Sequence, residues 1–185
     1  MRVSQWRRRA ALVASIAMAL TFGSLATASA ETAPAQTHTL FAARHDVPVG
    51  VVSIANECPA YVSSRLYLDV ETTGGWMLTS VDVAYGADVT DIPATNSGNP
   101  KIGQFPVRID ASIPTPSTSI EIAGAWAPGQ QLAVAVHANV VRVDEQGNVI
   151  ERAGAWAGEI DFPGNSIASY FVDGIDECIM IDPHG

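Results

Sequence analysis

Apolar and polar residues alternate with a period of two along most of this chain. Leu66, Leu68 and Val70 alternate with polar or charged neighbours, and the longest run of this kind covers residues 131–143. Such alternation is typical of a β-strand that buries one face against a core. It predicts eight strands, at residues 39–43, 49–55, 65–72, 76–85, 118–123, 131–143, 148–156 and 167–172.

Short turns separate several of these segments. Thr73-Gly74-Gly75 predicts a tight hairpin between two strands, and residues 144–148 predict a second one. Residues 127–130 mark a turn before the longest strand. The pattern therefore predicts an all-β protein, an antiparallel two-sheet β-sandwich of about eight strands, with a closed β-barrel as the alternative.

The beginning of the chain follows a different pattern. Four arginines precede an apolar run that ends near residue 22, and small side chains follow just before Glu31. This order predicts a signal peptide over residues 1–30. The apolar run is shorter than the ~20 residues that a membrane-spanning helix needs. We therefore expect a secreted, extracellular or periplasmic protein that is not inserted in a membrane after cleavage.

The predicted mature chain is strongly acidic. The full sequence has 10 Lys and Arg against 19 Asp and Glu, and four of the basic residues belong to residues 1–30. Cleavage would leave six basic residues and a net charge of −13. This charge argues against nucleic acid and anionic lipid as partners. We interpret residues 31–38 as a disordered lead-in, 39–172 as one domain and 173–185 as an acidic C-terminal tail, and we expect a monomer.

Cys58 and Cys178 are the two cysteines of the chain. In an oxidising compartment, two cysteines of one domain usually pair. We therefore predict a disulfide that ties the acidic tail to an early loop. A redox-active pair is the alternative, but the chain has no Cys-x-x-Cys motif to favour it.

The stretch from Asp88 to Pro116 contains five prolines and is predicted to be one long irregular loop. Long loops in compact domains often carry function. Asp88 and Asp91 are candidate calcium ligands, because carboxylates beside asparagines suit a hard cation, although the same residues also form ordinary turns. No other cofactor is predicted. We expect a binding surface here for an extracellular glycan or protein, with contacts from Trp76, Asn96, Asn99, Gln104 and Phe105.

Catalytic motifs are missing from the sequence. It contains neither Gly-x-Ser-x-Gly nor His-Glu-x-x-His. His137 lies within the longest predicted strand, and His45 lies at a strand end beside Asp46. A hydrogen-bonded structural role is the simpler interpretation of His137. A hydrolytic site near His137 or His45 is the alternative.

Residues 120–127 and 150–157 are identical at seven of eight positions. Each segment ends near a tryptophan, which is Trp126 in the first and Trp156 in the second. The simpler interpretation is two strands that each place a tryptophan at the core. The alternative is a stacking platform with the two rings side by side.

Four segments together resemble a known family. They are Glu71 to Trp76, the element Gly98-Asn-Pro-Lys-Ile-Gly-Gln-Phe-Pro106, residues 133–138, and residues 154–171 with their Phe-Pro-Gly-Asn sequence. In this order they resemble exported bacterial β-rich modules that have no assigned biochemical role. The resemblance implies a β-sandwich and an exported location, and it supplies no catalytic residues.

These observations lead to one main functional hypothesis and two alternatives. The main hypothesis is an exported, non-catalytic β-sandwich module with a binding or structural role outside the cell. The first alternative is an exported hydrolase, and the second is a secreted inhibitor of a protein partner.

Overall fold

The structure is a computed structural model that describes residues 35–43, 45–57, 64–127 and 129–175. All of these residues belong to one compact unit. The predicted signal peptide, Cys58 and Cys178 lie outside the described residues. Export and the disulfide therefore stay predictions.

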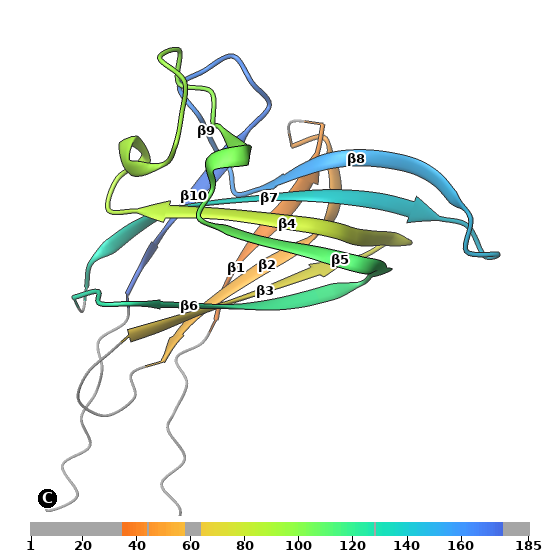
Figure 1. Cartoon of the computed structure of the whole chain (residues 1–185), viewed down its shortest axis with the longest axis horizontal. Helices are drawn as coiled ribbons and strands as arrows, with labels where there is room; N and C mark the ends of the chain where they lie inside the picture. The colour runs from red at the N-terminus through yellow and green to blue at the C-terminus, as the bar shows by residue number, and fades with distance from the viewer. Residues whose placement is uncertain (1–34, 44, 58–63, 128, 176–185) are drawn as a thin grey trace, which may run out of the picture. The chain divides into compact units, whose positions relative to one another are not determined.

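The described part of the chain forms ten strands and two short 3-10 turns (Figure 1). Within these ranges, no helix is long and apolar enough to cross a membrane. The 3-10 turns are η1 (Val89–Asp91) and η2 (Ile102–Gln104). The strands are β1 (Gln36–Ala42), β2 (Val47–Glu57), β3 (Ser64–Thr72), β4 (Trp76–Gly86), β5 (Val107–Thr115), β6 (Ser117–Gly124), β7 (Gln131–Val143), β8 (Val149–Ala157), β9 (Ile160–Asp161) and β10 (Ser169–Gly174).

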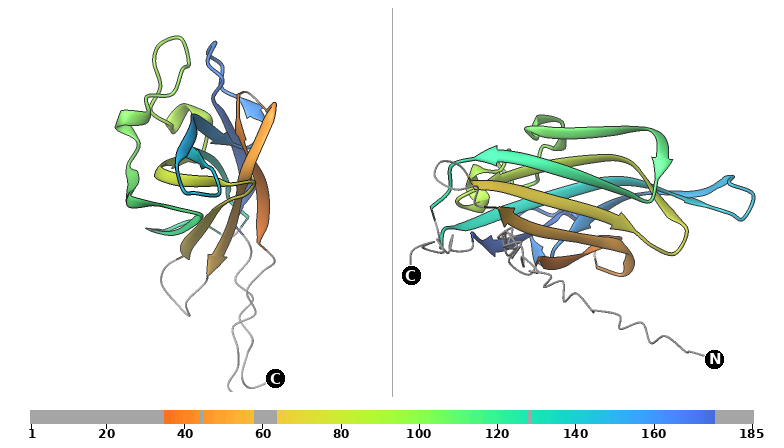
Figure 2. Two further views of the ribbon diagram at one scale, coloured as in Figure 1. Left: turned by 90° about the vertical axis from the view of Figure 1, so that its right-hand side faces the viewer. Right: turned by 90° about the horizontal axis from the view of Figure 1, so that it is seen from below.

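Eight strands form one antiparallel sheet in the order β5-β4-β7-β8-β1-β2-β3-β6. The sheet curls until its edge strands, β5 and β6, meet at the turn that joins them (Figures 1 and 2). β10 pairs with the first residues of β7, and β9 pairs with β10. The predicted all-β class is confirmed. The expected two layers belong to a single sheet that nearly closes, which is closer to the barrel alternative.

The main core fills the inside of the curled sheet. Every strand of the eight-strand path except β5 contributes fully buried apolar side chains to it. The alternation seen in the sequence places these residues inward, since successive side chains of a strand point to opposite faces. Examples from six strands are Leu40, Val52, Leu68, Val83, Ile120 and Val136.

A second, smaller apolar cluster lies on the outer face of β4, β7 and β8. Ala84, Ala133 and Ala135 present small side chains there, and Trp156 packs beside them. The loop after β4 covers them with Ile92 and Phe105, and the loop after β8 adds Phe162 and Ala168. Both faces of this part of the sheet are therefore buried.

All eight predicted strands are present, with boundary shifts of a few residues. Two boundaries were misplaced. β1 begins at Gln36, within the predicted disordered lead-in, because it pairs with β2. β10 extends to Gly174, within the predicted tail, because it pairs with β7. β5 lies inside the stretch that was predicted to be irregular, because residues 107–110 pair with β4.

One of the two predicted hairpins is wrong. Thr73 to Gly75 does form a tight turn, in which the backbone N–H of Trp76 donates to the carbonyl of Thr73 at 3.1 Å. The strands on either side do not pair, because β3 lies between β2 and β6 while β4 lies between β5 and β7. The hairpin at residues 144–148 is confirmed by the pairing of β7 with β8.

Gly50 marks a place where two strands approach closely. A Cβ atom at this residue would overlap the carbonyl oxygen of Glu71 on β3. We therefore expect Gly50→Ala to destabilise the protein by about 1–3 kcal/mol, as other overpacking substitutions do. The melting temperature should fall by roughly 2–12 °C for a domain of this size. Gly103→Ala is the matched control, because a Cβ at Gly103 meets no atom within 4 Å; equal melting temperatures for the two variants would contradict the prediction.

Candidate functional site

The predicted calcium ligands Asp88 and Asp91 are used in capping η1. Asp88 accepts a hydrogen bond from the backbone N–H of Thr90 at 2.9 Å, and Asp91 accepts one from the backbone N–H of Asp88 at 3.1 Å. The hydrogen bond from Thr90 lowers the pKa of Asp88. Among the described residues, no group of three His, Cys, Asp or Glu side chains could hold a metal ion. In the structure these two residues therefore cap η1. Calcium binding at this loop stays a prediction.

The asparagines and glutamine of the same loop have different environments. Asn99 accepts a hydrogen bond from the backbone N–H of Ser166 at 3.0 Å, which ties this loop to the loop after β8. Asn96 and Gln104 are exposed. Asn96 and Gln104 are thus on the surface of this loop, and Asn99 ties the loop to its neighbour.

The predicted aromatic contacts do not reach that surface. Phe105 is 9% exposed and packs edge-on against Trp156 in the second cluster. Trp76 is 6% exposed in the main core. It begins β4 whereas the loop follows the other end of that strand, so the two are roughly 30 Å apart at about 3.3 Å per residue. Neither ring is available as a stacking platform.

The repeated tryptophans also lie apart. Trp126 packs against the main core and makes an edge contact with Tyr85, at a centroid distance of 6.0 Å. Trp156 belongs to the second cluster. This arrangement fits the simpler interpretation, in which each tryptophan covers a core of its own.

A row of polar side chains crosses the outer face of β5, β4 and β7. The Nη1 of Arg108 donates to Oδ1 of Asp82 at 2.9 Å, and Nδ1 of His137 lies 3.3 Å from Oδ2 of the same carboxylate. Arg108 also forms a two-pronged pair with Asp110. Asp82 is 1% exposed and His137 is 7% exposed. The buried carboxylate thus has a partner on each oxygen.

The surroundings of His137 in this row favour its neutral form. Burial lowers its pKa, although the hydrogen bond and the charge of Asp82 act in the opposite direction. Because the carboxylate of Asp82 only accepts, Nδ1 carries the proton and Nε2 is left with a free electron pair. A Cβ atom added at Gly154 would lie 3.2 Å from Nε2, so the glycine leaves room for the ring. In the part of the chain that the structure describes, no hydroxyl or thiol is hydrogen-bonded to this ring, so the hydrolase hypothesis gains no support here.

His45 does not join this row. Its Nε2 lies 3.1 Å from Oδ1 of Asp161 on β9, and its ring makes an edge contact with Phe41. His45 adopts a positive φ of 66° in the turn between β1 and β2, which is uncommon for a residue other than glycine. The two histidines thus have separate carboxylate partners.

The sheet stays open between β5 and β6. β6 pairs with β3 over eight residues, and within the described ranges its other edge is unpaired. β5 leaves β4 in a bulge, in which residues 111–114 face Thr79 alone. We call the free edge of β6, this bulge and the pocket between them the seam.

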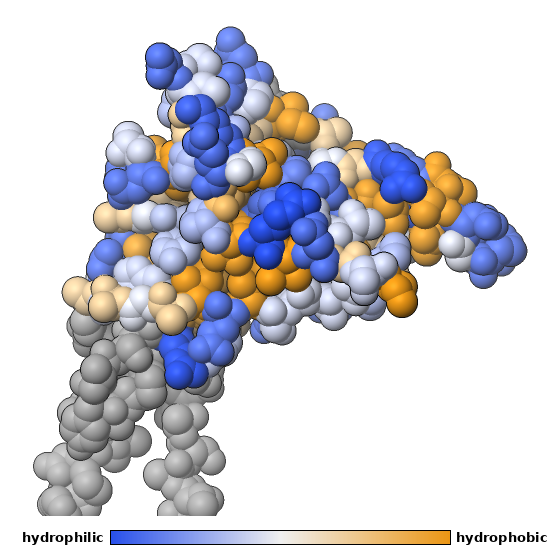
Figure 3. Space-filling view, viewed as in Figure 1, coloured by the Kyte–Doolittle hydropathy of each residue, from blue (hydrophilic) through white to orange (hydrophobic). Residues whose placement is uncertain are grey.

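The seam exposes apolar surface. Its pocket has a volume of about 270 Å³ and is lined by residues of β4, the β5 bulge and Thr118 of β6. Ile113 is 77% exposed and Ile109 is 38% exposed. Figure 3 shows apolar surface between β5 and β6, beside the charged side chains of β5. Sequence reasoning missed this site because β5 was predicted to be loop, although Val107, Ile109, Ala111 and Ile113 alternate with polar residues.

Comparisons with known proteins do not assign the chain to a family. A scan of family models, a search of curated proteins and a search of solved structures each found no significant match. The resemblance to exported bacterial modules therefore stays a prediction.

The lowered pKa of His137 predicts a pH effect on stability. Between this pKa and the ordinary value of about 6.5, the unfolded chain takes up a proton that the folded protein does not. The contribution of neutral His137 is thus fully present above about pH 6.5 and is lost as the pH falls toward the folded pKa. We expect the melting temperature of the parent minus that of His137→Gln to decrease between about pH 7.5 and 5.5. A difference that stays constant or grows on acidification would contradict this.

Proposed function

We propose that this protein is an exported, non-catalytic module that captures an extended segment of another protein at the seam. The observation that carries the proposal is the free edge of β6 beside an exposed apolar pocket. An extended peptide binds such an edge by adding a strand to the sheet. Its backbone would pair with β6, and alternate side chains would enter the pocket.

The free edge of β6 lacks the features that usually prevent another strand from pairing with a sheet edge. Sheet edges are usually protected by lysine, proline, bulges or very short strands. β6 keeps a regular register with β3 over all eight residues and contains neither lysine nor proline. Glu121 is its one charged residue, and it pairs with Arg65 on β3 at 3.0 Å.

Charge indicates what kind of segment fits. The outer faces of β3 and β6 expose Asp69, Glu71 and Glu121 against Arg65. The predicted mature chain is also acidic as a whole. A partner strand with Lys or Arg on the outward positions and aliphatic residues on the inward positions would match both faces of the seam. The glycan hypothesis has less support, since Trp76 and Phe105 are buried.

The probe is a fluorescein-labelled peptide of about seven residues that alternates Lys and Val, a typical strand length. We expect the fluorescence anisotropy of this peptide to rise when it is titrated with the protein expressed as the full chain. The same peptide with alternate backbone nitrogens methylated should not bind, because it cannot pair with β6 on that edge. A Glu-Val peptide should bind more weakly, because its charge repels that of β3 and β6. Equal binding of the methylated peptide would contradict strand addition.

Two matched variants locate the site. Ile113→Gln removes an exposed aliphatic side chain from the seam, and Ile150→Gln makes the same change on β8, where Ile150 is 60% exposed. Burying an aliphatic side chain contributes about 1.5–3 kcal/mol, so Ile113→Gln should raise Kd roughly 10-fold or more. Ile150→Gln should leave Kd unchanged. The proposal fails if both variants bind the Lys-Val peptide as the parent does.

A further inference from the structure

The two strands that flank the seam meet at one end, at the corner Thr115-Pro116-Ser117 (Figures 1 and 2). β5 ends at Thr115 and β6 begins at Ser117, so Pro116 alone joins them. The backbone N–H of Thr72 donates to the carbonyl of Pro116 at 2.8 Å. The hydroxyl of Thr115 donates to the carbonyl of Ser117 at 3.1 Å. These hydrogen bonds hold the corner in place at this end of the seam.

A further strand cannot pass through the corner within the sheet. Two residues of extended chain span at most about 7 Å, which limits the separation of Thr115 and Ser117. A strand placed between two others needs them about 9.5 Å apart, which is twice the ordinary spacing of paired strands. A segment that pairs with β6 must therefore end at the corner or leave the sheet there.

The pocket of the seam lies beside this corner. Thr115 of β5 and Thr118 of β6 both line it, and Leu78, Val81 and Ile113 supply apolar walls. A segment that ends at the corner would place its terminal side chain between these residues. The pocket thus suits the end of a chain.

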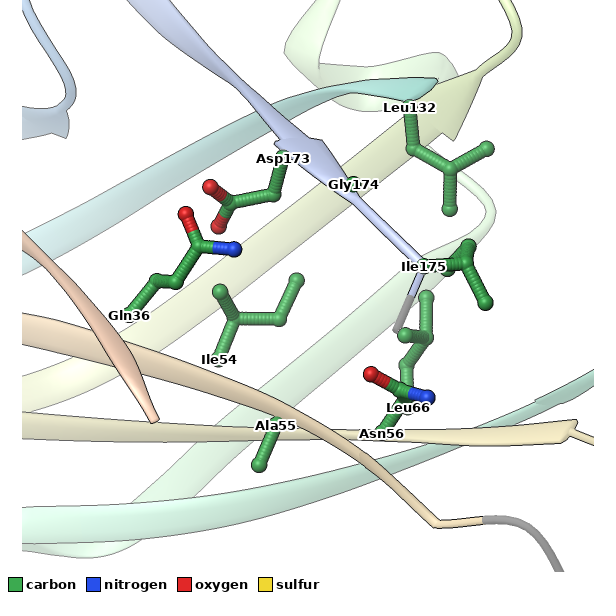
Figure 4. Close-up of a pocket in the computed structure, with 9 residues that line it drawn as sticks. All are labelled: Gln36, Ile54, Ala55, Asn56, Leu66, Leu132, Asp173, Gly174 and Ile175. Carbon is green, nitrogen blue, oxygen red and sulfur yellow. The ribbon is translucent and has the colours of Figure 1, made fainter. Parts of the chain in front are cut away.

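Another pocket, beside Asp173 on β10, is too small for such a residue (Figure 4). It has room for about one water molecule. Asp173 is 4% exposed, and its Oδ2 lies 2.9 Å from Nε2 of His38. Its Oδ1 is buried and has no hydrogen-bond partner among the described residues. Of these two pockets, the one in the seam is large enough for a side chain.

The charge of the seam pocket indicates which end of a chain it suits. Among the described residues that line it, Asp110 is the one with a charge, and its side chain is 64% exposed. A hydrogen bond from Arg108 lowers the pKa of Asp110, so this carboxylate is ionised at neutral pH. Arg108 also pairs with Asp82, so two carboxylates share one guanidinium. This cluster keeps a net charge of −1 while His137 is neutral.

We propose that the seam captures the free N-terminus of a partner chain, with the terminal ammonium beside Asp110 and the first side chain in the pocket. This inference rests on the proposed capture of a strand at the seam. A terminal ammonium supplies the positive charge that the cluster lacks, whereas a terminal carboxylate would be repelled. Because β6 begins at the corner, the captured segment runs in the same direction as β6. Such parallel pairing is only slightly less stable per residue than antiparallel pairing.

The test compares end-modified forms of the Lys-Val peptide, with Val first and fluorescein on the side chain of the last lysine. Anisotropy is measured with the protein expressed as the full chain at about pH 7, where an α-amino group is mostly charged. N-acetylation should raise Kd roughly 2–5-fold, the effect of losing one exposed ion pair. A Gly-Ser extension before the first valine should raise Kd similarly, because it moves the ammonium away from Asp110. Amidation of the C-terminus should leave Kd unchanged.

Matched variants assign the effect of acetylation to the pocket. In Asp110→Asn, the acetylated and free peptides should bind equally. Glu121→Gln is the control, because Glu121 is a carboxylate of β6 that does not line the pocket, and it should keep the difference between the two peptides. If Asp110→Asn does not fold, the comparison of peptide forms on the parent protein decides.

The outcomes separate this inference from the capture of a strand itself. Equal binding of the free and acetylated peptides to the parent would overturn the N-terminal assignment and leave capture intact. Weaker binding after amidation alone would assign the C-terminus instead and overturn the proposal. If no form binds, both the N-terminal assignment and capture at the seam fail.

Discussion

Strand β7 is buried on both faces over most of its thirteen residues, and β4, β8 and β10 all pair with it. Its inner face carries valines of the main core, and its outer face carries alanines of the second cluster. The loops after β4 and β8 can close over this strand because its outer side chains are small. The positions of the loop residues, of the polar row and of β10 all depend on this double burial.

Because β7 is buried on both faces, each polar side chain near it needs a hydrogen-bond partner. A buried polar group without one is unfavourable. Asp82 and Asp173 meet this requirement differently. Asp82 lies near the edge of the sheet, so the long side chain of Arg108 reaches it from β5 while His137 reaches it from β7. Asp173 lies deep at the other face, where His38 satisfies one oxygen alone. The first carboxylate is thus complete within the described chain, and the second is not.

The sequence was sufficient to predict the strands in which apolar and polar residues alternate. β3 buries one face in a single continuous core, so a period of two is strong there. In β7, which is buried on both faces, the period of two is an alternation of larger inner side chains with outer alanines. β5 was missed because Pro106 and Pro114 suggested a loop, although an edge strand tolerates proline where no hydrogen bond is needed. The turn after β3 was predicted correctly, but the pairing of β3 with β4 was not. Strand partners are decided by the packing of the whole sheet, which a short turn does not reveal. His137 was recognised as a structural candidate, whereas its partner Asp82 required the register between β4 and β7.

The two edges of the sheet differ in how they are protected. β5 carries Pro114, a bulge and the paired charges of Arg108 and Asp110, all of which discourage pairing with another strand. The bulge also turns β5 away from a regular course, because extra residues in one strand bend it locally. The gap beside β6 is therefore a consequence of the β5 sequence. A regular β5 would continue along β4 and bring its own edge toward β6. The bulge instead exposes Ile113 and, within the described ranges, leaves the edge of β6 opposite β3 without a partner strand. One added strand would bury the exposed isoleucine and pair with the unprotected edge at the same time. Both the apolar burial and the backbone hydrogen bonds would favour its binding.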